Sequence, residues 1–166
     1  GWKLNDSLVN IPRINDSIII TNPPYLANYS AKRKKIFEQV SKYFESTNYD
    51  DLYQIALEKC INEGSGVIII PETFINSSFP KNRLNSITIL EDNPFEDTEN
   101  PVCVVCFDGK TKRLSDIQLY KNDTLIGSLE YFESLRLKPS NSVKFRFNDI
   151  NGPLALRAVD TTDPKK

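Results

Sequence analysis

Ser17-Ile18-Ile19-Ile20-Thr21-Asn22-Pro23-Pro24-Tyr25 is the stretch from which the fold can be worked out. Its three consecutive isoleucines have branched side chains, which suit a β-strand that is covered on both faces. Pro23 and Pro24 cannot donate to a sheet ladder, and each forces the preceding residue out of the helical region. We therefore expect a short buried strand that ends in a stiff, extended loop. In open α/β sheets, ligands bind at this carboxyl edge of the strands.

Further strands are predicted downstream of this stretch. Gly64-Ser-Gly66-Val-Ile-Ile-Ile-Pro71 is an apolar run that begins in a glycine turn and ends at a proline. Residues 85–90 alternate as a strand does, and Val102–Phe107 follows at a distance typical of a hairpin partner. From Gly109 onward the sequence becomes polar and rich in turns. Three segments there alternate with the period of a strand, at 117–120, 124–126 and 143–147. They either extend the sheet or begin a second element.

Two helices are predicted between the first two strands. Residues 30–44 carry apolar side chains at helical spacing, which indicates one continuous helix capped by Ser30. Residues 50–60 indicate a second, amphipathic helix that Asp50 or Asn48 caps and that the glycine turn ends. This alternation of strand, helix and strand implies right-handed crossovers and a parallel sheet.

The composition excludes several classes of function. The 166 residues include 21 Lys and Arg against 22 Asp and Glu, so contacts with nucleic acid must come from local patches. The chain has no histidine, which excludes Ser-His-Asp catalysis, Cys-His catalysis and His-containing zinc sites within it. It also has no methionine, even at position 1, which suggests a processed, truncated or excised chain. No apolar run approaches the length that spans a membrane.

The three cysteines favour a reducing, cytoplasmic setting over a disulfide scaffold. Cys103 and Cys106 form a Cys-x-x-Cys pattern within the predicted strand Val102–Phe107. Residues three apart on a strand point to opposite faces, so their sulfurs should not meet. We interpret both as core cysteines and predict no metal site.

Asn22-Pro23-Pro24-Tyr25 after a buried strand resembles the S-adenosylmethionine-dependent amino-methyltransferases, which carry Asn-Pro-Pro-Tyr or Asp-Pro-Pro-Tyr after their fourth strand. An exocyclic amine is a poor nucleophile, because its lone pair is delocalised into the base ring. The resemblance implies that the Asn22 side-chain oxygen and the Pro23 carbonyl accept hydrogen bonds from this amine and stabilise the charge of the transition state. Pro23 and Pro24 fix the direction of that carbonyl. Tyr25 offers a flat face to an extruded base.

Two further stretches are similar to cofactor-binding motifs of this family. Trp2–Leu8 resembles the third motif, which implies that Asp6 contacts the adenine of the cofactor; a surface turn is the alternative for this acid. The Asp51-Leu52-Tyr53 start of the second helix resembles the fifth motif, so this turn is implied to contribute to the adenine pocket, with Asn22 also touching the cofactor. A glycine-rich loop like that of the first motif is missing. The resemblance therefore predicts that the chain lacks half of the cofactor site.

Contacts with DNA are implied at two other places. In the adenine-specific branch of the family, a loop aromatic packs on the flipped base opposite the tyrosine, and Phe95 matches that aromatic by position. Four consecutive cations follow the Pro-Pro loop. Because we expect them in the first turn of a helix, where the dipole disfavours positive charge, they suggest phosphate contacts; a solvated face is the alternative for Lys32, Arg33, Lys34 and Lys35.

The order of the motifs is similar to that of the adenine-N6 DNA methyltransferases of restriction–modification systems. The resemblance implies a partial Rossmann-like methyltransferase sheet with an antiparallel pair near its end. It also implies a partial catalytic domain at residues 1–108 and a β-rich extension, or the start of a target-recognition region, at 109–166. The expected cofactor is S-adenosylmethionine, and the expected substrate is an adenine flipped out of double-stranded DNA.

Three other interpretations stay open. Families that methylate RNA bases or protein glutamine also use Asn-Pro-Pro-Tyr. A second alternative is that the chain is a non-catalytic DNA-binding fragment. A third is that the motif is only a strand followed by a rigid loop, in which Asn22 has a capping role and Tyr25 is half-buried. The expected partners are DNA and either a restriction nuclease or a missing amino-terminal segment, with no membrane. The expected location is the cytoplasm.

Overall fold

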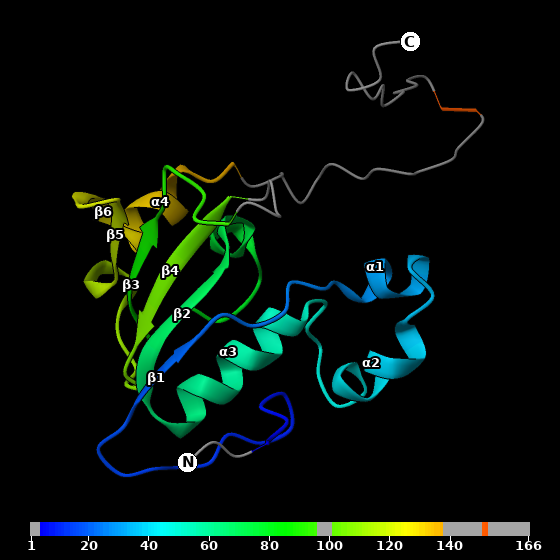
Figure 1. Cartoon of the computed structure of the whole chain (residues 1–166). Coiled ribbons are helices and arrows are strands. Elements are labelled where there is room, and N and C mark those ends of the chain that lie inside the picture. The colour runs from blue at the N-terminus through cyan, green and yellow to red at the C-terminus, as the bar shows by residue number, and fades with distance from the viewer. Residues whose placement is uncertain (1–3, 96–100, 138–150, 153–166) are drawn as a thin grey trace. The chain divides into compact units, whose positions relative to one another are not determined.

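The computed structural model of the chain describes residues 4–95, 101–137 and 151–152. The chain divides into two compact units, Gly1–Leu135 and Arg136–Lys166. Every helix and strand assigned among the described residues belongs to the first unit (Figure 1). The period-two segment expected at 143–147 lies outside the described residues.

The described residues form a mixed α/β fold around a six-stranded sheet with the order β1-β2-β4-β3-β5-β6. β1 pairs in parallel with β2, and β3 with β5. The β2–β4, β3–β4 and β5–β6 pairs are antiparallel. The parallel first pair and the β3–β4 hairpin confirm the predictions for these stretches. The strands are β1 Ile18–Thr21, β2 Ser65–Pro71, β3 Leu84–Ile89, β4 Val102–Phe107, β5 Gln118–Lys121 and β6 Thr124–Ser128.

The end of the sheet is built by β5 and β6. Their pairing extends the sheet, which was one of the two alternatives for residues 117–126. The helices and 3-10 turns that accompany the strands are α1 Asn28–Arg33, α2 Phe37–Phe44, α3 Leu52–Glu63, α4 Leu129–Leu135, η1 Glu72–Asn76 and η2 Leu114–Asp116.

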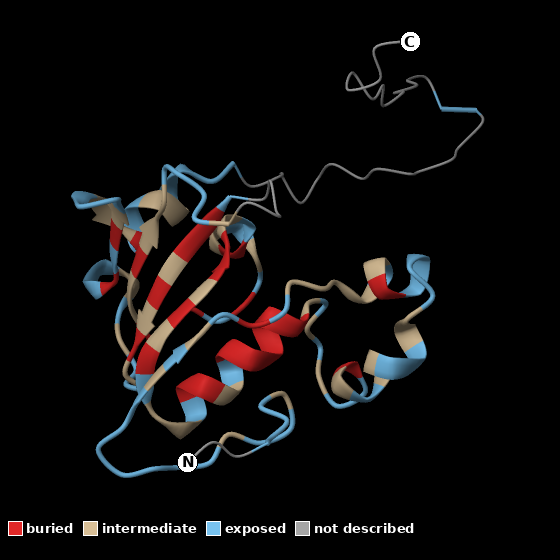
Figure 2. Cartoon of the chain, in the orientation of Figure 1, coloured by how far each residue is buried: buried red, intermediate tan, exposed pale blue. Residues whose placement is uncertain are grey.

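The core lies between α3 and one face of the sheet, where buried residues run along α3, β2 and β4 (Figure 2). Leu57 of α3 is completely buried, as are Ile68 of β2 and Phe74 of η1. α3 ends at Gly64 as predicted. Its N-cap residue is Asp51, without a side-chain cap hydrogen bond, so the predicted capping side chain of Asp50 or Asn48 is wrong.

β1 is less covered than its three isoleucines predict. It lies at the edge of the sheet, and its pattern alternates: Ile19 packs against the core, whereas Ile18 and Ile20 are 71% and 81% exposed. Successive side chains of a strand point to opposite faces, so a run of three isoleucines must place at least one on the far face. The expectation of a strand buried on both faces is therefore wrong for the described residues.

The predicted continuous helix over residues 30–44 is divided into α1 and α2. Lys35 has a left-handed backbone with φ of 58°. The Lys35 N–H donates to the Lys32 carbonyl and the Ile36 N–H to the Ala31 carbonyl, which is the Schellman arrangement that ends helices. Ser30 lies inside α1, and the N-cap residue is Ala27.

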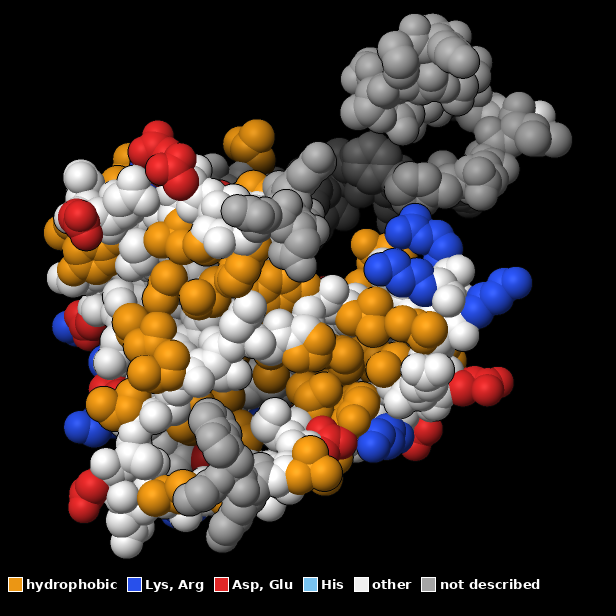
Figure 3. All heavy atoms as spheres, viewed as in Figure 1, with side chains coloured by type: hydrophobic (Ala, Val, Ile, Leu, Met, Phe, Trp, Pro, Cys, Tyr) orange, Lys and Arg blue, Asp and Glu red, His pale blue; other side chains and the backbone are white. Residues whose placement is uncertain are grey.

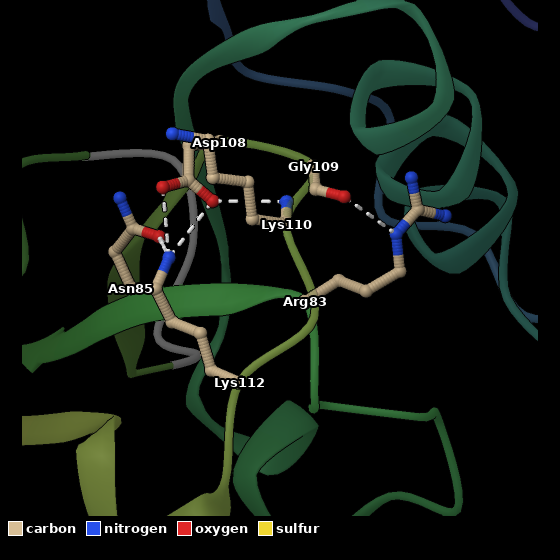
Figure 4. Close-up of polar contacts among 6 residues, drawn as sticks. All are labelled: Arg83, Asn85, Asp108, Gly109, Lys110 and Lys112. Atoms are coloured by element: carbon tan, nitrogen blue, oxygen red, sulfur yellow. Dashed lines mark hydrogen bonds and ion pairs between the residues drawn. The ribbon is translucent and has the colours of Figure 1, made fainter.

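A polar cluster secures the end of the sheet opposite Pro71 and Val102 (Figure 4). The Arg83 guanidinium donates to the Gly109 carbonyl at 3.3 Å. The Lys112 ammonium donates to both carboxylate oxygens of Asp108 at 2.8 Å and also to the side-chain oxygen of Asn85. These bonds hold the chain that leaves β4 against β3.

β1 approaches β2 so closely that position 66 admits only glycine. A Cβ atom at Gly66 would lie 2.1 Å from the carbonyl oxygen of Ile19. We expect Gly66→Ala to lower the free energy of unfolding by about 1–3 kcal/mol, because the β1 backbone must move. Gly64→Ala is the matched control, since its Cβ would meet only the end of the Ile19 side chain at 3.8 Å. Equal urea denaturation midpoints for the two variants would contradict the close approach.

The left-handed backbone at Lys35 should cost stability, because a Cβ atom disfavours this conformation by about 1–2 kcal/mol. Lys35→Gly is expected to raise the free energy of unfolding by about 1 kcal/mol. Lys34→Gly removes the same charge at a residue with φ of −80°, so it should be neutral or destabilising. Thermal unfolding of both variants checks the break between α1 and α2, and a loss of stability in Lys35→Gly would argue against it.

The hydrogen bond from Lys112 lowers the pKa of the Asp108 carboxyl below its usual value. A carboxyl whose pKa is lower in the folded state stabilises the protein above its unfolded pKa, and this contribution is lost as the pH falls through the folded pKa. Asp108→Asn should therefore destabilise the chain by about 0.5–1 kcal/mol at pH 7, and by less below about pH 4. Asp123→Asn, in the exposed β5–β6 turn, should change stability at neither pH.

Candidate functional site

A cavity of about 480 Å³ opens at the carboxyl ends of β1 and β2. Its volume lies within the range of small-molecule sites. The parallel register of the two strands pairs Thr21 with Ile68, so the loops that follow them emerge at one edge. The residues that line the cavity are Tyr25, Ala27, Tyr29, Ser30, Asp51, Tyr53, Pro71, Glu72, Thr73, Asn76 and Pro101.

The Pro-Pro loop is tied to the start of α3 by a short antiparallel bridge between Ala27 and Asp51. The Asn28 N–H donates to the Asp50 carbonyl at 2.8 Å, and the Leu52 N–H donates to the Leu26 carbonyl at 3.1 Å. Two stretches singled out from the sequence, the Asn-Pro-Pro-Tyr loop and the first turn of α3, are therefore brought together. Both contribute side chains to the cavity.

Tyr25 is anchored through its hydroxyl group. This oxygen lies 2.6 Å from the side-chain Oδ1 of Asn22 and 3.0 Å from the carbonyl oxygen of Ile69 in β2. Burial raises the pKa of the Tyr25 hydroxyl to about 12, so it stays protonated at neutral pH. Pro23 beside it is buried, whereas Asn22 and Pro24 are exposed. The loop thus presents Asn22 at the surface and holds Tyr25 at the cavity wall.

The two predicted residues of α3 lie differently. Tyr53 lines the cavity with most of its ring buried, and burial raises its pKa to about 12. Leu52 points instead into a second apolar cluster, with Phe44 and Ile55, and does not line the cavity. Sequence reasoning gave these neighbours one role, although adjacent helical residues face different directions.

Two carboxylates lie at the cavity: Asp51 belongs to the turn that the resemblance implies for the adenine pocket, whereas Glu72 was not predicted as a site residue. Burial, and then the charge of Asp50, raise the pKa of the Asp51 carboxyl above its usual value. Glu72 begins η1 directly after Pro71, and Asn76 ends that turn. Glu72 could have been predicted from its place directly after a buried strand. Ligands bind at the carboxyl ends of strands in α/β sheets, and this holds for β2 as it does for the strand before Asn22.

Asp6 lies in a surface turn and is engaged by α2. Its carboxylate accepts a hydrogen bond from the Tyr43 hydroxyl at 2.7 Å and forms an ion pair with Lys42 at 3.4 Å. These hydrogen bonds, that of Tyr43 first, lower the Asp6 pKa. Asp6 is not among the residues that line the cavity, and residues 1–3 of its motif lie outside the described residues.

Phe95 also stands apart from the cavity lining, although Pro101 at the other end of its loop belongs to it. Its ring is partly exposed, and its N–H is held by the side chain of Asn93 at 3.0 Å. The intervening residues 96–100 lie outside the described residues.

Lys and Arg side chains gather over α1 and the turn after it, shown in blue in Figure 3. Lys32 and Arg33 occupy the last turn of α1, where the helix dipole favours positive charge. The premise that these cations sit unfavourably in a first turn is therefore wrong. Lys32 packs its ammonium over the Phe37 ring at 4.8 Å. Within the described part of the chain, neither it nor Arg33, Lys34 or Lys35 forms an ion pair with an acidic side chain.

Cys103 and Cys106 are both free, with Cys103 buried and Cys106 half-buried on the opposite face of β4. No cluster of three or more potential metal ligands occurs among the described residues. The described helices also include none that is both long and apolar enough to cross a membrane.

Comparison with known proteins identifies the family. The Eco57I restriction-modification methylase family matches residues 16–98, which is half of the chain. The match covers β1, the Asn-Pro-Pro-Tyr loop, α3, β2 and most of the residues that line the cavity. No curated protein matches the chain. The chain belongs to the Eco57I restriction-modification methylase family.

Proposed function

We propose that this chain forms part of the catalytic domain of an S-adenosylmethionine-dependent DNA adenine-N6 methyltransferase. The observation that carries the proposal is the meeting of Tyr25 with Asp51 and Tyr53 around one cavity, at the edge where the Asn-Pro-Pro-Tyr loop leaves β1. The family match supports a methylase, and the partly parallel sheet is compatible with a partial Rossmann-like fold. Residues 1–108 remain the proposed catalytic part, and 109–166 the proposed extension.

The proposed reaction needs acceptors for the target amine and a surface for its ring. Asn22 and the Pro23 carbonyl accept hydrogen bonds from the amine, which lets its lone pair become nucleophilic as the transition state forms. The Tyr25 ring stacks on the extruded adenine, with Phe95 proposed as the opposite face. The amine nitrogen would take the methyl group directly from the cofactor, which would leave as a thioether, and the nitrogen would lose one proton, so no covalent bond to the protein would form.

Side chains of the cavity wall support the proposal that part of S-adenosylmethionine binds there. The aromatic ring of Tyr53 suits the adenine of the cofactor, and the carboxylates of Asp51 and Glu72 suit a sulfonium cation. The bound cofactor supplies an electrophilic methyl group. Asp6 and Leu52 remain predicted cofactor contacts from the family resemblance alone. Four cations follow the loop and form no ion pair with an acidic side chain of the described residues. We propose that they contact DNA phosphates; they are Lys32, Arg33, Lys34 and Lys35.

The proposal is tested by calorimetry with S-adenosylmethionine and by transfer of its labelled methyl group to unmethylated duplex DNA. Asn22→Ala should bind the cofactor within about twofold of the unaltered chain, yet lose at least about 100-fold in transfer rate, because it removes a transition-state acceptor. Asn15→Ala, an exposed asparagine before β1, is the matched control and should change neither quantity.

Three outcomes would contradict the proposal. Unchanged transfer by Asn22→Ala would remove the acceptor from the mechanism. Label found in RNA or in protein glutamine, and not in DNA, would favour the related enzyme classes that use the same motif. Salt-dependent DNA binding without any cofactor binding or transfer would indicate a DNA-binding fragment.

A further inference from the structure

The Tyr25 hydroxyl lies between two oxygen atoms that both need a donor. It is 2.6 Å from Asn22 Oδ1 and 3.0 Å from the Ile69 carbonyl oxygen. A tyrosine hydroxyl carries one hydrogen and therefore donates one full hydrogen bond, whereas both neighbours in this arrangement are acceptors. One of the two short oxygen–oxygen contacts is left without a hydrogen atom.

The Ile69 carbonyl is the better acceptor for the hydrogen of the Tyr25 hydroxyl. Ile69 lies one residue beyond Ile68, the last residue of β2 that has a partner in β1. The sheet fixes the position of its carbonyl, and a backbone carbonyl at a partly buried position requires a donor. The Tyr25 hydroxyl therefore contacts β2 just beyond the point at which its pairing with β1 ends. The Asn22 side chain is exposed, and the terminal torsion of an asparagine has two broad orientations, so its amide can turn.

We propose that the Tyr25 hydroxyl is a positioning group that fixes which way the Asn22 amide faces. In this arrangement Asn22 Nδ2–H donates to the Tyr25 oxygen, and the Tyr25 hydroxyl donates to the Ile69 carbonyl. Each contact then has one donor and one acceptor. The half-turn of the amide leaves Asn22 Oδ1 on the side away from Tyr25, with both lone pairs available.

This inference rests on the proposed function and explains how one loop residue prepares another. An Asn22 amide that turned freely would offer its NH₂ group to the target amine in one of its two orientations, and two donors repel. The chain from the Ile69 carbonyl through Tyr25 to Asn22 presents the acceptor before substrate arrives. The Tyr25 ring and the Tyr25 hydroxyl thus have separate tasks, since the ring lines the cavity and the hydroxyl faces β2.

Nuclear magnetic resonance of the unaltered chain tests the arrangement without any activity. We expect nuclear Overhauser contacts between the Asn22 side-chain amide protons and the Tyr25 ring protons next to the hydroxyl. Tyr25→Phe should shift the Asn22 side-chain amide resonances, whereas Tyr131→Phe, on exposed α4, should not. If the Asn22 amide protons make no contact with Tyr25 and ignore its substitution, the positioning role is wrong.

Transfer rates supply a second test through a double-mutant cycle. Tyr25→Phe should lower single-turnover transfer about tenfold, with cofactor affinity unchanged, because one hydrogen bond that orients Asn22 is lost. In the Asn22→Asp background the same substitution should cost less than about twofold, since the two oxygens of a carboxylate are equivalent. An equal loss in both backgrounds would mean that Tyr25 acts only through its ring, and would overturn the inference.

The two proposals fail in different ways. Intact resonance contacts in a chain that methylates nothing would leave the orientation of Asn22 established and overturn the proposed function. Methyl transfer that survives without those contacts would do the reverse.

Discussion

The parallel pairing of β1 with β2 is the constraint on which the candidate site depends. It brings the carboxyl ends of two strands to one edge, where Asn22 follows one strand and Glu72 follows the other. Gly66 permits this pairing, because any side chain there would collide with the Ile19 backbone. The hydroxyl of Tyr25 then contacts the carbonyl of Ile69, one residue beyond the last β2 residue that pairs with β1. A displacement of β1 would therefore disturb the cavity wall as well as the sheet.

The site is held at two levels of rigidity. α3, β2 and β4 are largely buried and fix the wall on which Tyr53 lies. The loop after Tyr25 is attached to this frame by backbone hydrogen bonds of the Ala27–Asp51 bridge. Polar side chains of the site, by contrast, sit at strand ends and in turns, as functional groups of α/β proteins usually do. This division explains how exposed Asn22 can lie beside a well-packed core.

Local patterns were sufficient to predict much of the fold. The apolar runs predict β2 and β4, and the spacing of residues 50–60 predicts α3 and its end at Gly64. The break between α1 and α2 was not predictable in the same way, because a lysine rather than a glycine adopts the left-handed conformation at position 35. The parallel pairing of β3 with β5 is also a long-range choice, which no local pattern specifies.

The site was predicted in part, for a physical reason. Tyr25 and Tyr53 were predicted from short motifs of neighbouring residues, and both line the cavity. Asp51 belongs to the same predicted turn as Tyr53, whereas Glu72 became a candidate site residue only because the fold places it at the cavity. Asp6 stays a prediction from its motif: Tyr43 and Lys42 engage its carboxylate in the structure, and Asp6 does not line the cavity.

The identity of the methylated atom is the most direct test of this account. Unmethylated genomic DNA would be incubated with the chain and with S-adenosylmethionine that carries a labelled methyl group, and the nucleosides would then be separated by mass spectrometry. The account predicts label in N6-methyladenine, and none when Asn22 is replaced by alanine. Label confined to N4-methylcytosine, or no label in DNA at all, would contradict it.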